Sequence, residues 1–128
     1  MAYKYCVRKK IDKSSDEEKV RYYAVPVISG KINLRGMAKK ISQRCTLTEG
    51  DVMATIIELA HIIEDELCNG NKVIIDDIGS LYLSATSPGF NTPEDCKPRY
   101  VKANRICFKS STKLRKKLPE IKFKKVSE

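Results

Sequence analysis

The run EGDVMATIIELAHIIEDELC, residues 49–68, is the feature that most constrains how this chain folds. Its apolar residues recur at helical spacing and predict a helix over 49–69, with Gly70 ending it in the left-handed conformation. The apolar positions are Val52, Met53, Ile56, Ile57, Leu59, Ala60, Ile62, Ile63 and Leu67. A stripe this wide exceeds what the single modest core of a 128-residue chain buries. We therefore predict that the helix is covered on two sides and that the protein is a dimer.

Shorter segments on both sides of this helix predict an α+β fold. Aromatic and β-branched residues favour strands over 3–11 and 20–28, and Pro26 is typical of an edge strand. Asn33 begins a short first helix, and Thr48 caps the long one. The remaining expected elements are strands over 73–76, 80–86 and 99–109, a third helix capped by Ser110 or Ser111, and a final strand over 121–126 that pairs with an N-terminal strand.

The pair Asp76-Asp77, which stands just before Gly79, has two readings: a carboxylate site or a turn between strands. A metal or acid–base site needs further convergent ligands, and the only histidine, His61, lies within the long helix. Asp and Gly are typical of turns, and the five cysteines are far apart and form no C-x-x-C pair. We therefore expect a structural turn, and no catalytic residue, metal, cofactor or small-molecule substrate.

Positive charge is concentrated at the C-terminal end. Residues 1–96 hold 13 Lys and Arg against 14 Asp and Glu, whereas residues 97–128 hold 12 against 2. This asymmetry indicates a polyanionic partner, either nucleic acid or an anionic membrane surface, although a solvated basic tail has the same composition. No apolar run approaches the roughly 20 residues that span a bilayer. The N-terminus lacks the apolar segment of a secretory signal, so we expect no membrane association and a cytoplasmic protein.

Two short motifs carry a resemblance to a known family. The strand turns at IGSLYL, residues 78–83, and a basic strand ends in FKSSTKL, residues 108–114. Over about residues 32–118 the chain resembles the bacterial HU/IHF family of histone-like DNA-binding proteins, whose corresponding runs are GFGTF and FKPGKAL. The added strands at both ends are similar to a longer HU-like subfamily. We therefore expect an N-terminal β extension over 1–30 and an HU-like domain over 31–128.

The resemblance implies an intertwined homodimer with a two-helix body, a β-sheet saddle, and two β-ribbon arms that reach around double-stranded DNA. In such proteins basic residues of the saddle and arms contact phosphates, and a proline at the arm tip wedges between base pairs from the minor groove. On this sequence the DNA-binding positions are Pro93, Lys97, Arg99, Lys102, Arg105, Lys109, Lys113 and Arg115. The dimer-interface positions are Ile56, Ile63, Ile78, Leu81 and Phe108.

The arm tip departs from the family pattern. NTPEDCK stands where the family has RNPxTG, so that Glu94 and Asp95 follow Pro93 directly. Pro93 is therefore either the wedge or an ordinary loop proline.

Alternation along the returning strand predicts where its charges lie. If 99–109 is extended throughout, Arg99, Arg105 and Lys109 share one face while Lys102 lies on the other. The function implied is a nucleoid-associated, largely sequence-nonspecific and architectural DNA-binding protein that acts as a dimer. The alternative is an HU-fold protein–protein interaction module without significant DNA binding.

Overall fold

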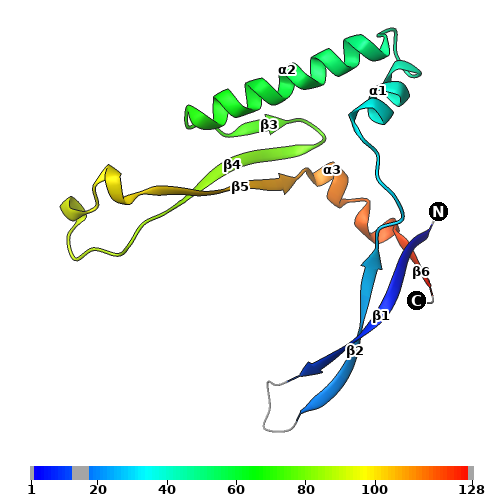
Figure 1. Cartoon of the computed structure of the whole chain (residues 1–128), viewed down its shortest axis with the longest axis horizontal. Coiled ribbons are helices and arrows are strands. Elements are labelled where there is room, and N and C mark those ends of the chain that lie inside the picture. Colours follow the sequence, from blue (N-terminus) through cyan, green and yellow to red (C-terminus); the bar gives the residue numbers. More distant parts are fainter. Residues whose placement is uncertain (1, 13–17, 127–128) are drawn as a thin grey trace. The chain divides into compact units, whose positions relative to one another are not determined.

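The computed structural model describes residues 2–12 and 18–126 and divides by its contacts into two compact units. The terminal unit comprises the residues up to 33 together with those from 117 onward, and the central unit comprises residues 34–116 (Figure 1). Each unit holds a three-stranded sheet, and the central unit also holds the α-helices. The structure therefore confirms a mixed α+β fold. The domain boundary between residues 30 and 31 stays a prediction.

The terminal unit is a sheet of strand order β2-β1-β6. Strands β1 (Ala2–Asp12) and β2 (Lys19–Val27) form an antiparallel hairpin, and β6 (Lys122–Lys125) pairs in parallel with β1. A short 3₁₀ turn, η3 (Leu118–Glu120), precedes β6. The predicted pairing of the last strand with an N-terminal strand is confirmed, as is the edge position of the strand that contains Pro26.

Two helices form the body of the central unit, α1 (Leu34–Ser42) and α2 (Glu49–Cys68). Thr48 caps α2, because its Oγ1 accepts a hydrogen bond from the Asp51 backbone N–H at 3.1 Å. The helix ends as predicted, with Gly70 at a φ of 88°. No helix in the described part of the chain is long and apolar enough to cross a membrane.

The apolar stripe of α2 is only partly buried within one chain. Helix α2 contacts α1 and the neighbouring sheet, and this side buries Val52 and Leu67, with Ala38 of α1. On another side Ile57 and Ile62 keep 44% and 55% of their surface exposed. The structure thus bears out that the stripe is wider than the core of one chain.

The second sheet has the order β3-β4-β5, with strands β3 (Val73–Ile75), β4 (Gly79–Thr86) and β5 (Lys102–Ser110). Strands β4 and β5 run beyond the short β3 as a two-stranded ribbon, which we call the arm (Figure 1). Its far end is a loop with two 3₁₀ turns, η1 (Pro93–Asp95) and η2 (Pro98–Tyr100). A short helix, α3 (Thr112–Arg115), follows β5.

The predicted strand over 99–109 is wrong at its start. Pro98 has no amide hydrogen and a fixed φ, and it begins the η2 turn, which includes Arg99. The strand therefore starts at Lys102, and Arg99 does not belong to the alternation of β5.

Candidate nucleic-acid interface

The aspartate pair lies in a tight turn between β3 and β4, as one of its two readings predicts. The Ile78 backbone N–H donates to the Ile75 carbonyl at 3.1 Å and closes the turn. Asp77 carries the left-handed conformation, with a φ of 68°. Among the described residues, no group of three His, Cys, Asp or Glu side chains is placed to hold a metal ion.

Gly79 is required by a close approach of the backbone. A Cβ atom at this position would lie 2.4 Å from the Lys109 carbonyl oxygen and 2.7 Å from the Phe108 ring. The absent side chain lets β4 and β5 start their pairing directly after the turn, where Gly79 faces Ser110 in the register.

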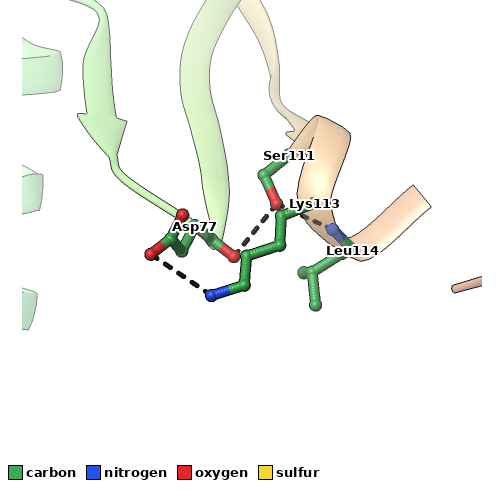
Figure 2. A network of polar contacts seen from close by, with 4 residues as sticks. All are labelled: Asp77, Ser111, Lys113 and Leu114. Carbon is green, nitrogen blue, oxygen red and sulfur yellow. Dashed lines mark hydrogen bonds and ion pairs between the residues drawn. The ribbon is translucent and has the colours of Figure 1, made fainter. Parts of the chain in front are cut away.

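A small polar network joins this turn to helix α3 (Figure 2). The Ser111 hydroxyl donates to the Asp77 carbonyl oxygen at 3.0 Å and accepts from the Leu114 backbone N–H at 3.1 Å. Lys113 Nζ lies 3.6 Å from Asp77 Oδ2, and both side chains are exposed. Ser111, rather than Ser110, is therefore the cap of α3, and the candidate residue Lys113 has an acidic neighbour.

A β-bulge in the arm determines where its cations lie. Ser84 pairs with Arg105, but the next residue, Ala85, pairs with Ala103, so Asn104 is an extra residue of β5. One extra residue reverses the alternation of side chains beyond it.

The bulge therefore corrects the predicted split of the charges. Register partners in a sheet share a face. The partners of Lys102, Arg105 and Lys109 in β4 are separated from one another by even numbers of residues, so they point to the same side. These partners are Thr86, Ser84 and Ser80. All three cations thus lie on one face of the arm, which we call the cationic face. Its strands contain no Asp or Glu.

Lys72 adds a fourth charge to the cationic face. Its Nζ lies 5.8 Å from the centre of the Tyr82 ring, and Tyr82 stands between Ser80 and Ser84 on this face. The sequence analysis missed Lys72. The available signal was its position two residues before Ile74 of β3, because residues two apart along an extended chain share a face. Within residues 2–12 and 18–126, Lys102, Arg105 and Lys109 form no ion pair.

An open hollow lies beside the cationic face. It has a volume of about 280 Å³, and its cationic lining side chains are Lys72, Lys109 and Arg115. Asp76 and Asp77 line it as well, so this hollow is of mixed charge. The structure thus brings Arg115 near Lys109.

The arm loop holds the remaining candidates. Arg99 is stacked over the ring of Tyr100, with its Cζ 4.8 Å from the ring centre. The ring centre of Phe90 lies 5.3 Å from that of Tyr100. Lys97 and Pro93 are exposed, and Pro93 is the first residue of η1. These three candidates therefore lie in the loop and not on the strands of the cationic face.

The predicted interface positions fall into two groups. Ile56, Ile63 and Leu81 are half-buried within the chain. Ile78 and Phe108 are 48% and 54% exposed. The structure also exposes two apolar side chains that the sequence reasoning left out, Leu83 at 48% and Ile106 at 60%. They are register partners on the arm face opposite the cations.

A two-helix body that contacts a three-stranded sheet, with two strands drawn out into an arm, defines an HU-like class of small α+β proteins. Residues 1–125 match the HU-HIG family, described as an HU domain fused to wHTH, Ig, or glycine-rich motif. The chain belongs to this family, and the resemblance seen in the sequence is confirmed. The search of curated proteins finds no match.

The fold is also similar to a solved structure, that of a candidate bacterial DNA-binding protein from Bacteroides vulgatus ATCC 8482. The TM-score is 0.66 and the identity 9%, so this similarity shows the fold alone. The match covers 99% of this chain and 49% of the other. The chain thus spans about half the length of that protein.

Proposed function

We propose that this protein is a largely sequence-nonspecific, architectural DNA-binding protein. It acts as a homodimer, binds and bends the duplex, and catalyses no reaction. The cationic face of the arm, extended by Arg115, contacts the phosphates. Membership of the HU-HIG family and the name of the solved structural relative support this proposal.

One observation carries the proposal: the bulge at Asn104 gathers Lys102, Arg105 and Lys109 on one face. Cations that form no ion pair within the described residues, on strands without Asp or Glu, are suited to phosphates, which carry about one charge per 1.7 Å of duplex. Contacts of this kind position a protein without reading the base sequence. The hydroxyls of Ser80 and Thr86, the register partners of Lys109 and Lys102, add hydrogen-bond donors for phosphate oxygens.

The exposed apolar surface of the central unit supports the homodimer. Ile57 and Ile62 on α2, and Ile106 and Phe108 on the arm, are 44% to 60% exposed. Large apolar patches of this kind mark interaction surfaces, and a second copy would cover the side of α2 that its own chain leaves exposed.

The arm loop is assigned to the minor groove in this proposal. Pro93 is exposed at the loop and is the position at which to test insertion between base pairs. Glu94 and Asp95 repel phosphates, so the loop contributes little to the affinity for the backbone. A protein with this role is nucleoid-associated.

The test is a titration of a labelled duplex of about 30 base pairs at several salt concentrations, with wild type and Lys102→Gln/Arg105→Gln/Lys109→Gln. Saturable binding by the wild type is expected, with an affinity that falls steeply as salt rises. The triple variant should lower the slope of log affinity against log salt by about 3 per protomer, or about 5 for the homodimer, since each neutralised phosphate contributes about 0.9.

A matched control removes three charges from helix α1, in Arg35→Gln/Lys39→Gln/Lys40→Gln. These side chains are exposed and lie outside the arm, so the slope should stay close to that of the wild type. Equal losses in the two triple variants would mean that only net charge matters. Absence of saturable binding at low salt would leave an HU-fold protein–protein interaction module.

A further inference from the structure

The terminal sheet carries a second set of cations that the proposed function does not use. Side chains alternate between the two faces of a strand, and register partners share a face. Seven cationic positions fall on one face of this sheet: Lys4, Arg8, Lys10, Lys19, Arg21, Lys122 and Lys124. We call this the basic face. All seven residues are exposed, and Asp12, opposite Lys19 at the hairpin end, is the acidic position in this register.

Like charges stand directly opposite one another on the basic face. Lys10 pairs with Arg21 across the hairpin, and Lys4 pairs with Lys124 across the parallel pair. Such cross-strand pairs are unfavourable for the isolated sheet. A bound polyanion turns this repulsion into attraction, since its charges lie between the cations.

The opposite face of the same sheet has a different character. An aromatic cluster lies there, in which the ring centres of Tyr3 and Tyr5 are 5.7 Å and 6.3 Å from that of Phe123. An apolar hollow of about 500 Å³ is lined by Tyr5, Ala24, Pro26 and Phe123, which all belong to this face. Only Lys9 and Lys125 among the sheet's Lys and Arg fall on it. The cations are therefore segregated and not spread over the surface.

We infer that the basic face of the terminal sheet is a second binding surface for double-stranded DNA, which it holds through the phosphates. Residues on one face of a strand recur about every 6.8 Å. This spacing is about twice the rise per phosphate along one strand of a duplex, which is about 3.4 Å. Interfaces with proteins are dominated by buried anchor side chains, and the apolar hollow of this sheet lies on the other face. Tyr23 and Val25 are exposed apolar side chains on the basic face, but they stand between cations and do not line that hollow. The surface is independent of the arm.

The test compares two matched double variants of the full chain, Lys10→Gln/Lys124→Gln and Lys9→Gln/Lys125→Gln. The lysines of the two variants are neighbours on the same strands and point to opposite faces. Affinity for a duplex of about 30 base pairs is measured between 50 and 200 mM salt. Loss of the two basic-face lysines should lower the log–log salt slope by about 2 per protomer, or about 4 for the homodimer, so the affinity falls roughly a hundredfold less over this range. The control should match the wild type.

Both pairs are also placed in the background Lys102→Gln/Arg105→Gln/Lys109→Gln, which separates this inference from the proposed function. Residual duplex binding is expected there, and Lys10→Gln/Lys124→Gln should weaken it further while the control does not. A melting temperature close to that of the wild type is expected for Lys10→Gln/Lys124→Gln, because both side chains are exposed and the like-charge pair of Lys4 and Lys124 is relieved.

Several outcomes would overturn the inference. The inference fails if Lys10→Gln/Lys124→Gln keeps the salt slope of the wild type. If the arm variant Lys102→Gln/Arg105→Gln/Lys109→Gln loses slope in the same experiment, the proposed function still stands. Equal effects of the two double variants mean that only net charge matters. Displacement of the duplex from the arm-neutral background by poly-L-glutamate, as efficiently as by unlabelled duplex of equal charge, points to an acidic protein instead.

Discussion

Gly79 and Ser111 carry much of the local structure at the base of the arm. Gly79 leaves room for the Lys109 carbonyl and the Phe108 ring, and Ser111 ties α3 to the carbonyl of Asp77. Neither residue is charged, yet each positions a strand or helix that bears cations of the candidate interface.

Gly79→Ala should destabilise the protein by about 1–3 kcal/mol, because a Cβ atom would overlap backbone and ring atoms that cannot both move away. Gly30→Ala is the control, since nothing lies within 4 Å of a Cβ atom there. Urea denaturation measures both free energies of unfolding. Equal stability of the two variants would show that β5 shifts freely at this point.

Ser111→Ala should lower the free energy of unfolding by about 1 kcal/mol, since it removes the cap of α3 and the bond to Asp77. Ser110→Ala, at the neighbouring residue, should stay within about 0.5 kcal/mol of the wild type. Thermal and urea denaturation distinguish them. If Ser110→Ala has the larger effect, Ser110 and not Ser111 caps the helix in solution.

At the scale of elements, the arm depends on a single extra residue. With Asn104 present, Lys102 faces the same side as Arg105 and Lys109. The Ser84 hydroxyl also donates to the Arg105 carbonyl at 3.3 Å, next to the bulge. The charge of the arm is thus a property of the register between β4 and β5.

Deletion of Asn104 should restore regular pairing and move Lys102 to the opposite face. We expect the salt slope of duplex binding to fall by about 1 per protomer, or about 2 for the proposed homodimer, the value expected for loss of one phosphate contact in each protomer. Lys102→Gln should have the same effect, and combining it with the deletion should add nothing. An unchanged slope in the deletion variant would show that Lys102 makes no phosphate contact.

At the scale of the whole molecule, the described residues bury few apolar side chains. Cys6, Ala38, Val52 and Leu67 are the buried apolar residues of these segments. Ile62 of α2 keeps 55% of its surface exposed and lines a shallow hollow with Leu59. Apolar burial within one chain is thus sparse, and the proposed homodimer would increase both this burial and the stability.

Ile62→Asp should weaken the homodimer by at least about 2 kcal/mol, or roughly 30-fold in the dissociation constant, because it places a charge in an apolar contact. Gln43→Asp adds the same charge at an exposed position after α1 and should leave the dimer intact. Sedimentation equilibrium measures both constants. A monomeric wild type, or equal constants for the two variants, would contradict the dimer.

Local patterns in the sequence were sufficient for many elements. The helical spacing and caps predicted a helix over 49–69, where α2 runs from Glu49 to Cys68, and the motifs IGSLYL and FKSSTKL indicated the family. Alternation and β-branched residues placed the terminal strands, including the last one that pairs with β1. These features depend on residues within a few positions of one another.

Only the tertiary structure decided which charges lie together. The Asn104 bulge reverses the alternation that the sequence suggested for Lys102, and the Pro98 turn removes Arg99 from β5. The basic C-terminal residues are divided between the two units. Those up to 116 belong to the central unit, whereas β6 pairs with β1 in the terminal sheet, which also carries Lys4 and Lys10. The physical reason is that strand register and pairing are non-local, because they depend on contacts between segments that lie far apart in the chain.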